Sequence, residues 1–422
     1  MFQERGRTRK STSLQSQSNG ESKTPIQCLI GYEFEIADWI LFKEQERQPE
    51  QTDLEYREAS SYKKGTLLYE EELWQMVADT DVRRTPYMEF VTKPFPETIE
   101  GYGQALDAFS EIRTLCQQIW QSVPEPHPDD NFRYLPLSDV INFLNLADEN
   151  AMLQTKLPNP APTFSPQTTA GVVLSELPAV FAKLAGSYLT DPEDLAARKR
   201  QGQEYMSTNG TPGSFALRYA VDRSRDLTQS WGLSKHFEGF FSYVLFYLIQ
   251  AYGGTSSYAK NFTSILARTD FARMFELLPL EEQEWLKENN ASEFLDLIEW
   301  ALPEHANNLD TPFFFRGIFL NMPATHHQML KRLTRRTWLV DITKGMDRLT
   351  ERNFPNRLRA YEMESLGAMG DKTDEIKGIQ APILEFRGGR KRLTPDEAED
   401  YVSESFKMLL LLHEGQDTFW GE

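Results

Sequence analysis

The sequence predicts a protein of the α+β class, in which a mixed or antiparallel sheet is closed by a strand near the C-terminus. Strand-like patterns occur early in the chain, at 26–36, 87–92 and 166–174, and once more at 381–387. The stretch of about 175–375 is mostly helical in pattern, and there is no regular alternation of strands and helices. That order argues against a doubly wound parallel sheet and favours one sheet with a large helical insertion before its last strand.

The first 24 residues form a segment of their own. They carry five basic and two acidic side chains, a local charge of +3, and are rich in Ser and Gln. No apolar periodicity begins before Ile26, so little burial is available to offset the entropy of ordering the segment. We therefore expect a disordered basic leader at 1–24 and a catalytic domain at 25–422; an export signal is the alternative role for the leader.

The next elements follow from their patterns. Residues 26–36 (IQCLIGYEFEI) alternate apolar and polar side chains with the period of a strand. A polar excursion is expected at 44–64, a short helix around 70–77, a second strand at 87–92 (YMEFVT) and a helix at 98–121.

The rest of the chain is interpreted in the same way. A third strand is expected at 166–174, helices at 191–203, 232–251, 278–300 and 327–349, and the last strand at 381–387 (APILEFR). The apolar run 240–251 has 12 residues, which is short of the roughly 20 that a bilayer span requires, so a buried helix is expected. The final helix should begin with Thr394 as N-cap, Pro395 at the first position and Glu397 at the third.

Composition excludes several classes of function. The 422 residues include 45 basic and 63 acidic ones, a formal charge of −18, which argues against a general nucleic-acid binder. Two cysteines cannot build a disulfide framework or a Cys-rich zinc site. The N-terminus has no apolar signal-peptide core. We expect no membrane span. The protein is expected to be cytoplasmic, or to be secreted without a classical signal peptide and to act in the cytosol of a target cell.

Carboxylates inside strands are the most informative feature. Glu33 and Glu35 stand at i and i+2 of one predicted strand and therefore on the same face. Glu89 lies inside the predicted strand YMEFVT. In the last strand, ILEFR, Glu385 and Arg387 again stand at i and i+2. Buried carboxylates are costly without a compensating charge, and Mg²⁺ or Mn²⁺ would supply one through oxygen ligands. Arg387 could then stabilise charge on a transferring phosphoryl group. The alternative is an exposed sheet face on which these carboxylates meet water or Lys.

These motifs, in the order GYEFE, MEFVTKPF, PQTTAGV and APILEFR, resemble the carboxylate–amine ligases of the glutamine synthetase superfamily. The resemblance covers short strands at both ends of the chain and implies a curved, mainly antiparallel sheet of the glutamine synthetase-like type. It further implies that Glu33, Glu35, Glu89 and Glu385 bind metal and that Arg387 contacts phosphate, with Glu385 and Arg387 serving catalysis. Where many relatives carry histidine, this chain has Gln167, Thr168 and Thr169; Gln167 and Thr169 would hydrogen-bond nucleotide or substrate.

The implied chemistry is ATP- and Mg-dependent. ATP would convert a substrate carboxylate into an acyl phosphate, and an amine would displace phosphate to form an amide or isopeptide bond. Both partners could be protein side chains. Two further cations, Lys260 and Arg268, are spaced by eight and would lie about two turns apart on one helix face, where they could bind phosphate or an anionic substrate. Plain surface charges are the alternative for that pair.

Three functions therefore compete at this stage. The first is the amide ligase. The second is a secreted effector or toxin that uses the same site to modify a protein or peptide, a hypothesis motivated by the basic leader. The third is a non-catalytic binding protein whose acidic sheet face docks a partner.

Overall fold

A computed structural model describes the chain in twelve ranges: 28–44, 61–80, 86–124, 132–141, 146–156, 161–187, 213–253, 265–304, 307–311, 334–345, 372–387 and 392–414. The leader predicted at 1–24 and the helix predicted at 191–203 lie outside these ranges. Within them the protein is a mixed α+β structure, as the order of its sequence patterns predicts.

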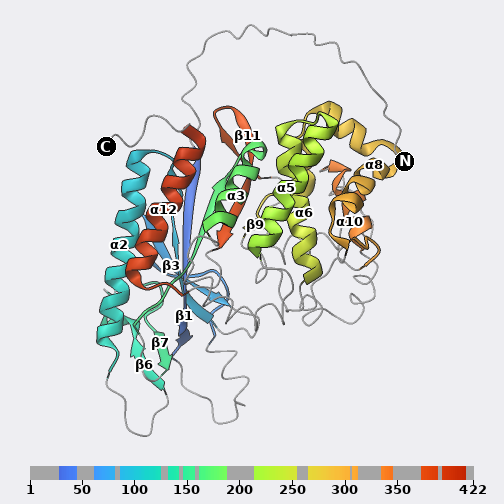
Figure 1. Ribbon diagram of the computed structural model, residues 1–422. Helices are drawn as coiled ribbons and strands as arrows, with labels where there is room; N and C mark the ends of the chain where they lie inside the picture. The colour runs from blue at the N-terminus through green and yellow to red at the C-terminus, as the bar shows by residue number, and fades with distance from the viewer. Residues whose placement is uncertain are drawn as a thin grey trace.

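One large sheet organises the described part of the molecule (Figure 1). Its main path follows the order β10-β11-β8-β1-β4-β3-β2, and every pairing along it is antiparallel. The strands are β1 (Leu29–Lys43), β2 (Thr66–Glu70), β3 (Trp74–Thr80), β4 (Pro86–Thr92), β8 (Ser165–Gly171), β10 (Thr373–Ile376) and β11 (Ile379–Arg387). Four shorter or peripheral strands join this path: β5 (Phe95–Pro96), β6 (Phe132–Pro136), β7 (Ala151–Lys156) and β9 (Ile265–Ala267).

The expected closure of the sheet by its last strand is wrong. β11 lies inside the path, between β8 and β10, because the chain enters it through a β10–β11 hairpin that extends the sheet outward. The two ends of the path, β10 and β2, are not paired with each other, so the described sheet is open.

β1 is the longest strand and changes partners along its length. Its first part pairs with β4 and β8, and residues Trp39–Lys43 pair with β7. The register with β4 shifts between Ile36 and Ile40, which marks a bulge at the change of partner. The side chains of Ile30, Tyr32 and Phe34 on one face of β1 are buried.

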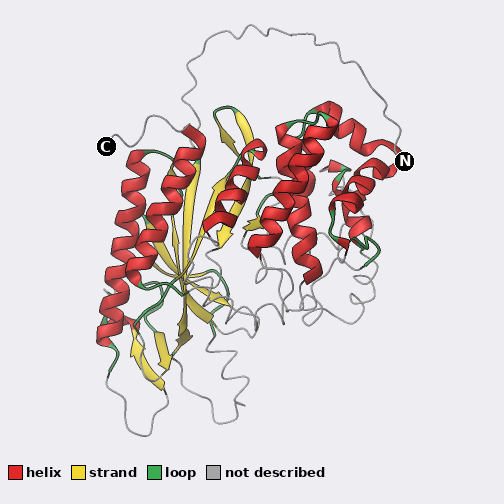
Figure 2. Cartoon of the chain, in the orientation of Figure 1, coloured by secondary structure: helices red, strands yellow, loops and turns green. Residues whose placement is uncertain are grey.

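Two helices cover that apolar face. α2 (Ile99–Ser122) and α12 (Pro395–Glu414) lie side by side along the sheet (Figures 1 and 2). The ring of Phe34 contacts that of Phe109 from α2 at a centroid distance of 5.0 Å, and the Tyr32 hydroxyl donates to the backbone oxygen of Val402 in α12. The opposite, polar face of β1 therefore points away from this helical layer.

Both helices begin where the sequence predicts. The Thr98 side chain accepts from the Gly101 N–H at the start of α2. At the start of α12, the Thr394 N–H donates to the Glu397 carboxylate, while the Glu397 N–H donates to Thr394 Oγ1 at 3.4 Å, a capping box.

The predicted helical insertion lies between β8 and β10 and contributes the second lobe of the structure. Its described helices are α3 (Leu177–Ser187), α5 (Gly213–Trp231), α6 (Lys235–Gly253), α7 (Phe271–Glu276), α8 (Leu280–Ala301) and α10 (Arg335–Ile342). α6 contains the apolar run and is buried among the others, as its length predicts. Among the described helices, none has both the length and the apolar character that crossing a membrane requires.

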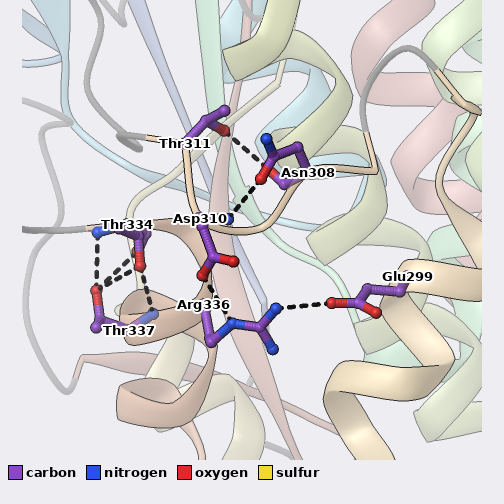
Figure 3. A network of polar contacts seen from close by, with 7 residues as sticks. All are labelled: Glu299, Asn308, Asp310, Thr311, Thr334, Arg336 and Thr337. Carbon is purple, nitrogen blue, oxygen red and sulfur yellow. Dashed lines mark hydrogen bonds and ion pairs between the residues drawn. The ribbon is translucent and has the colours of Figure 1, made fainter.

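A polar network joins α8, the loop before 311 and α10 (Figure 3). The Arg336 guanidinium donates to Glu299 Oε1 and to Asp310 Oδ1, each at 2.9 Å. Thr334 caps α10 through reciprocal hydrogen bonds with Thr337. These contacts fix α10 against α8 at the outer side of the helical lobe.

Two expectations about local structure are wrong. Residues 70–77 do not form a helix, because they take part in the β2–β3 hairpin, whose second strand pairs with β4 over its whole length. The hairpin formed by β6 and β7 is absent from the sequence expectations altogether, since its short strands lack a clean alternation of polar and apolar side chains.

Candidate active site

The antiparallel register gathers the predicted carboxylates on one sheet face. Glu35 of β1 is directly opposite Glu89 of β4, and Glu33 is opposite Gln167 of β8. Thr169 of β8 is opposite Glu385 of β11. Directly opposite residues of neighbouring strands project to the same side, so these positions share the face that points away from α2 and α12.

One end of this face carries a close group of three carboxylates: Glu35, Glu89 and Asp79. They offer oxygen atoms that all lie within 4.8 Å of one another. Asp79 belongs to β3, two residues beyond Val77, which is the partner of Glu89. Sequence reasoning missed Asp79 because its strand was expected to be a helix; the paired register of β3 and β4 was the signal that would have found it.

Burial among other carboxylates raises the pKa of Glu89 to about 9. Burial is the main cause, since the residue is only 8% exposed, and the negative charges of Glu33, Asp79 and Glu35 add to it. Glu89 therefore holds its proton at neutral pH unless a cation enters the group. A carboxyl group in this condition is a sensitive reporter of bound positive charge.

Lys64 supplies one cation to this end of the face. Its ammonium group donates to Asp79 Oδ1. Burial by itself would lower the pKa of Lys64. The hydrogen bond to Asp79 and the negative charges of Asp79, Glu89 and Glu35 outweigh burial, so the pKa of Lys64 is raised. Lys64 thus stays charged and partly neutralises the group.

The other end of the face is built around Glu385, which is 0% exposed. Arg268 Nε lies 2.6 Å from Glu385 Oε2, and its terminal nitrogen lies 3.6 Å from Glu33 Oε1. The Arg268 side chain is 18% exposed, so part of it is accessible to solvent or ligand. A planar cation between two carboxylates, partly accessible, is suited to contact an anionic oxygen such as a phosphate.

Arg268 reaches this place from the bend that directly follows a strand, and not from a helix. The expected helix that would carry Lys260 and Arg268 on one face is wrong, because Ile265–Ala267 form β9, which pairs with β11. The Arg268 N–H donates to the backbone oxygen of Ile383 at 2.9 Å, which anchors the residue beside Glu385. Lys260 lies outside the described residues.

Gln167 connects the two ends. It is buried in β8, and its side-chain Nε2 donates to Glu35 Oε1 at 2.7 Å, while Glu33 is its partner in the adjacent strand. Gln167 Oε1 is buried and accepts no hydrogen bond from the residues that the structure describes. An oxygen of this kind is available to a ligand or to a metal-bound water.

Arg387 occupies the end of β11, opposite Gln167, in the same row as Glu33. Its register position places it on the carboxylate face, and its side chain lies outside the described part of the chain, so its predicted contact with phosphate stays a prediction. The described face thus presents five carboxylates (Glu33, Glu35, Asp79, Glu89, Glu385) and two cations (Lys64, Arg268).

Comparisons with known proteins do not assign a family. No family model matches the sequence, and no curated protein matches it either. The chain is similar to a solved structure described as that of a Vibrio cholerae toxin from the MARTX/VgrG family, with a TM-score of 0.39 and 12% sequence identity. That alignment covers 91% of this chain and 99% of the other. A likeness at this level carries no argument about fold or activity, so the function has to be inferred from the site.

Proposed function

We propose that the carboxylate face is the active site of an ATP- and Mg²⁺-dependent carboxylate–amine ligase with a glutamine synthetase-like sheet. The observation that supports it most is the shared face of Glu33, Glu35, Glu89 and Glu385, which come from three strands distant in sequence. Together with the motif resemblance, this arrangement favours a divalent-cation site for phosphoryl transfer over an ordinary exposed sheet face.

The donor set fits a hard divalent cation. Every ligand candidate is a carboxylate oxygen, the ligand type that Mg²⁺ and Mn²⁺ prefer. The raised pKa of Glu89 fits as well, because a cation among Glu35, Asp79 and Glu89 would remove the repulsion that keeps Glu89 protonated. When bound, the cation would supply charge neutralisation for the phosphates of ATP.

Each residue of the face would have its own role. Glu35, Asp79 and Glu89 would hold one cation. Glu33 and Glu385 would lie beside the position of a second cation. Arg268, and Arg387 from its register position, would bind the phosphoryl oxygens and lower the repulsion between ATP and the substrate carboxylate. Gln167 would orient Glu35 and present its own oxygen to a bound group.

The chemical outcome would be an amide or isopeptide bond. A carboxylate is a poor electrophile, so its conversion to an acyl phosphate, with release of ADP, makes it reactive towards an amine. The amine nitrogen then forms the new bond to the acyl carbon, the carbon–oxygen bond to phosphate breaks, and the amine proton leaves to a base. Exclusion of water from buried Glu385 and its surroundings would limit hydrolysis of the acyl phosphate.

A direct test is Mg²⁺-dependent ADP formation by the full chain in the presence of a candidate carboxylate and amine. Glu385→Gln and Glu33→Gln should each abolish turnover while circular dichroism shows an intact fold. Glu284→Gln is the matched control, since Glu284 is exposed on α8, a helix that packs mainly on α6, α7 and α10. Unchanged turnover in both site variants would refute the metal assignment.

Thermal shift separates the ligase from a purely binding protein. Mg-ATP at about 100 times its Kd should add about 2.7 kcal/mol to the free energy of unfolding. A protein whose acidic face only docks a partner would show no such shift.

The effector hypothesis is tested separately, through the leader. Deleting residues 1–24 should abolish export and preserve ADP formation in vitro. Normal export without the leader would refute this role.

A further inference from the structure

A second cluster of metal-ligating side chains lies away from the carboxylate face. Cys28, Glu97 and His413 each offer a ligand atom, and these atoms lie within 4.8 Å of one another. All three residues are buried. Two further carboxylates border the cluster: Glu176 Oε2 lies 3.4 Å from His413 Nε2, and Asp374 Oδ2 lies 3.3 Å from Cys28 Sγ.

The backbone fixes this cluster from distant parts of the chain. Cys28 immediately precedes β1, and its backbone oxygen accepts from the Glu97 N–H at 2.9 Å, directly after β5. His413 is in the last turn of α12, and the Lys377 side chain donates to its backbone oxygen from the β10–β11 turn. Segments far apart in the sequence therefore bring these three side chains together.

The polar atoms of the cluster are incompletely satisfied. His413 Nδ1 lies 2.8 Å from Glu97 Oε1 and 2.7 Å from Glu97 Oε2. On the other side of the ring, buried His413 Nε2 forms an ion-pair contact with Glu176 Oε2, and neither atom has a hydrogen bond among the residues that the structure describes. His413 is 7% exposed, so this imidazole nitrogen is directed into the interior and not towards water.

Carboxylates gather around the buried thiol and imidazole. Glu97 contacts His413 Nδ1, Glu176 faces His413 Nε2 and Asp374 contacts Cys28 Sγ. A divalent cation suits such a position, because a coordinated thiol is deprotonated and the carboxylates next to it become favourable.

We propose that Cys28, Glu97 and His413 form a structural Zn²⁺ site through His413 Nδ1, with Asp374, which contacts Cys28 Sγ, as the candidate fourth ligand. The donor set of one sulfur, one imidazole nitrogen and carboxylate oxygens matches the ligands that Zn²⁺ takes in tetrahedral sites. Its soft thiolate distinguishes it from the oxygen-only carboxylate face, which suits Mg²⁺. The site would clamp the start of β1 to the end of α12 and does not rest on the proposed ligase activity.

The test uses Co²⁺ alone as a spectroscopic substitute for Zn²⁺ on the full chain after treatment with a chelator. Wild-type protein should show a thiolate-to-Co²⁺ charge-transfer band and tetrahedral d–d absorption, and added Zn²⁺ should displace both. Cys28→Ser should lose the charge-transfer band and bind Zn²⁺ at least about tenfold more weakly. Cys116→Ser is the matched control and should behave as wild type, since Cys116 is the second buried cysteine and lies in α2.

Two results would overturn the proposal. One is the lack of a charge-transfer band in wild-type protein at saturating Co²⁺, which would reduce the cluster to a buried His413–Glu97 ion pair. The other is a band that persists in Cys28→Ser. Co²⁺ bound only at the carboxylate face would give d–d absorption without a thiolate band, and that outcome would count against the proposal as well.

Discussion

Glu35 of β1 and Glu89 of β4 are directly opposite each other in an antiparallel ladder, on the sheet face that α2 and α12 leave uncovered. Two acidic side chains in one cross-strand pair repel each other, and the normal partners of such a pair are opposite charges or apolar groups. Asp79 from β3 adds a third carboxylate to the same place. Without a bound metal ion this arrangement costs folding free energy, which Lys64 and the proton on Glu89 offset only in part, and several predictions come from it.

The stability of the cation-free protein should fall as pH rises from about 4.5 to about 9. The folded-state pKa of Glu89 is raised from 4.5 to about 9, so in this range the folded state binds a proton that the unfolded state has lost. The slope from this residue is at most about 1.4 kcal/mol per pH unit. Glu89→Gln should flatten the profile and raise the free energy of unfolding at pH 8, measured by urea denaturation. A variant with the wild-type slope would contradict the assignment.

Binding of Mg²⁺ should release close to one proton per protein at neutral pH. The reason is that Glu89 is protonated before binding and must ionise to become a ligand. Calorimetry in two buffers of different ionisation enthalpy measures the number directly. In Glu89→Gln the release should vanish, whereas in Glu284→Gln, on the surface of α8, it should persist.

Replacing Arg268 by Ala should lower the free energy of unfolding by about 3 kcal/mol, because it removes the guanidinium from the fully buried carboxylate of Glu385. The double variant Arg268→Ala with Glu385→Gln should recover part of that loss. Arg113→Ala provides the comparison, since Arg113 pairs with exposed Asp396 and Glu399 and should matter by less than about 1 kcal/mol. Additivity of the two site substitutions would mean that they are not coupled.

Gly239 and Gly103 should respond in opposite ways to replacement by Ala. A Cβ at Gly239 in α6 would stand 1.6 Å from the backbone oxygen of Leu174, so the substitution should destabilise by about 1–3 kcal/mol. A Cβ at Gly103 in α2 meets nothing within 4 Å, and helix propensity should stabilise the protein by about 0.5–1 kcal/mol. Thermal unfolding of the two variants tests the packing of α6 against the segment that follows β8.

Much of the sheet could be predicted because its informative strands are encoded locally. In β1, Tyr32 and Phe34 alternate with Glu33 and Glu35, and that period alone identifies both the strand and its two faces. The capping pattern at Thr394 and the apolar periodicity from Ile99 onwards located two helix starts for the same reason. The common face of the strand carboxylates was expected from the resemblance and agrees with the observed register.

Other features depend on partners far away in the sequence. The segment 70–77 has Leu73, Met76 and Val77 at helical spacing, yet pairing with β2 and β4 makes it part of a hairpin. Because this segment was expected to be a helix, Asp79 was not predicted to join the carboxylates of the sheet face. Arg268 was expected on a helix and functions as the partner of Glu385, 117 positions away along the chain, a contact that no local pattern contains.

The bulge in β1 has a consequence for how this protein can change in evolution. Between Ile30 and Ile36, an inserted or deleted residue would exchange the two faces, sending Tyr32 and Phe34 into the polar site and the glutamates into the core. Beyond Ile36 the strand has already shifted its register and changed its neighbour, so an additional residue can be absorbed there. Length variation among homologues should therefore be tolerated after Ile36 and be excluded before it.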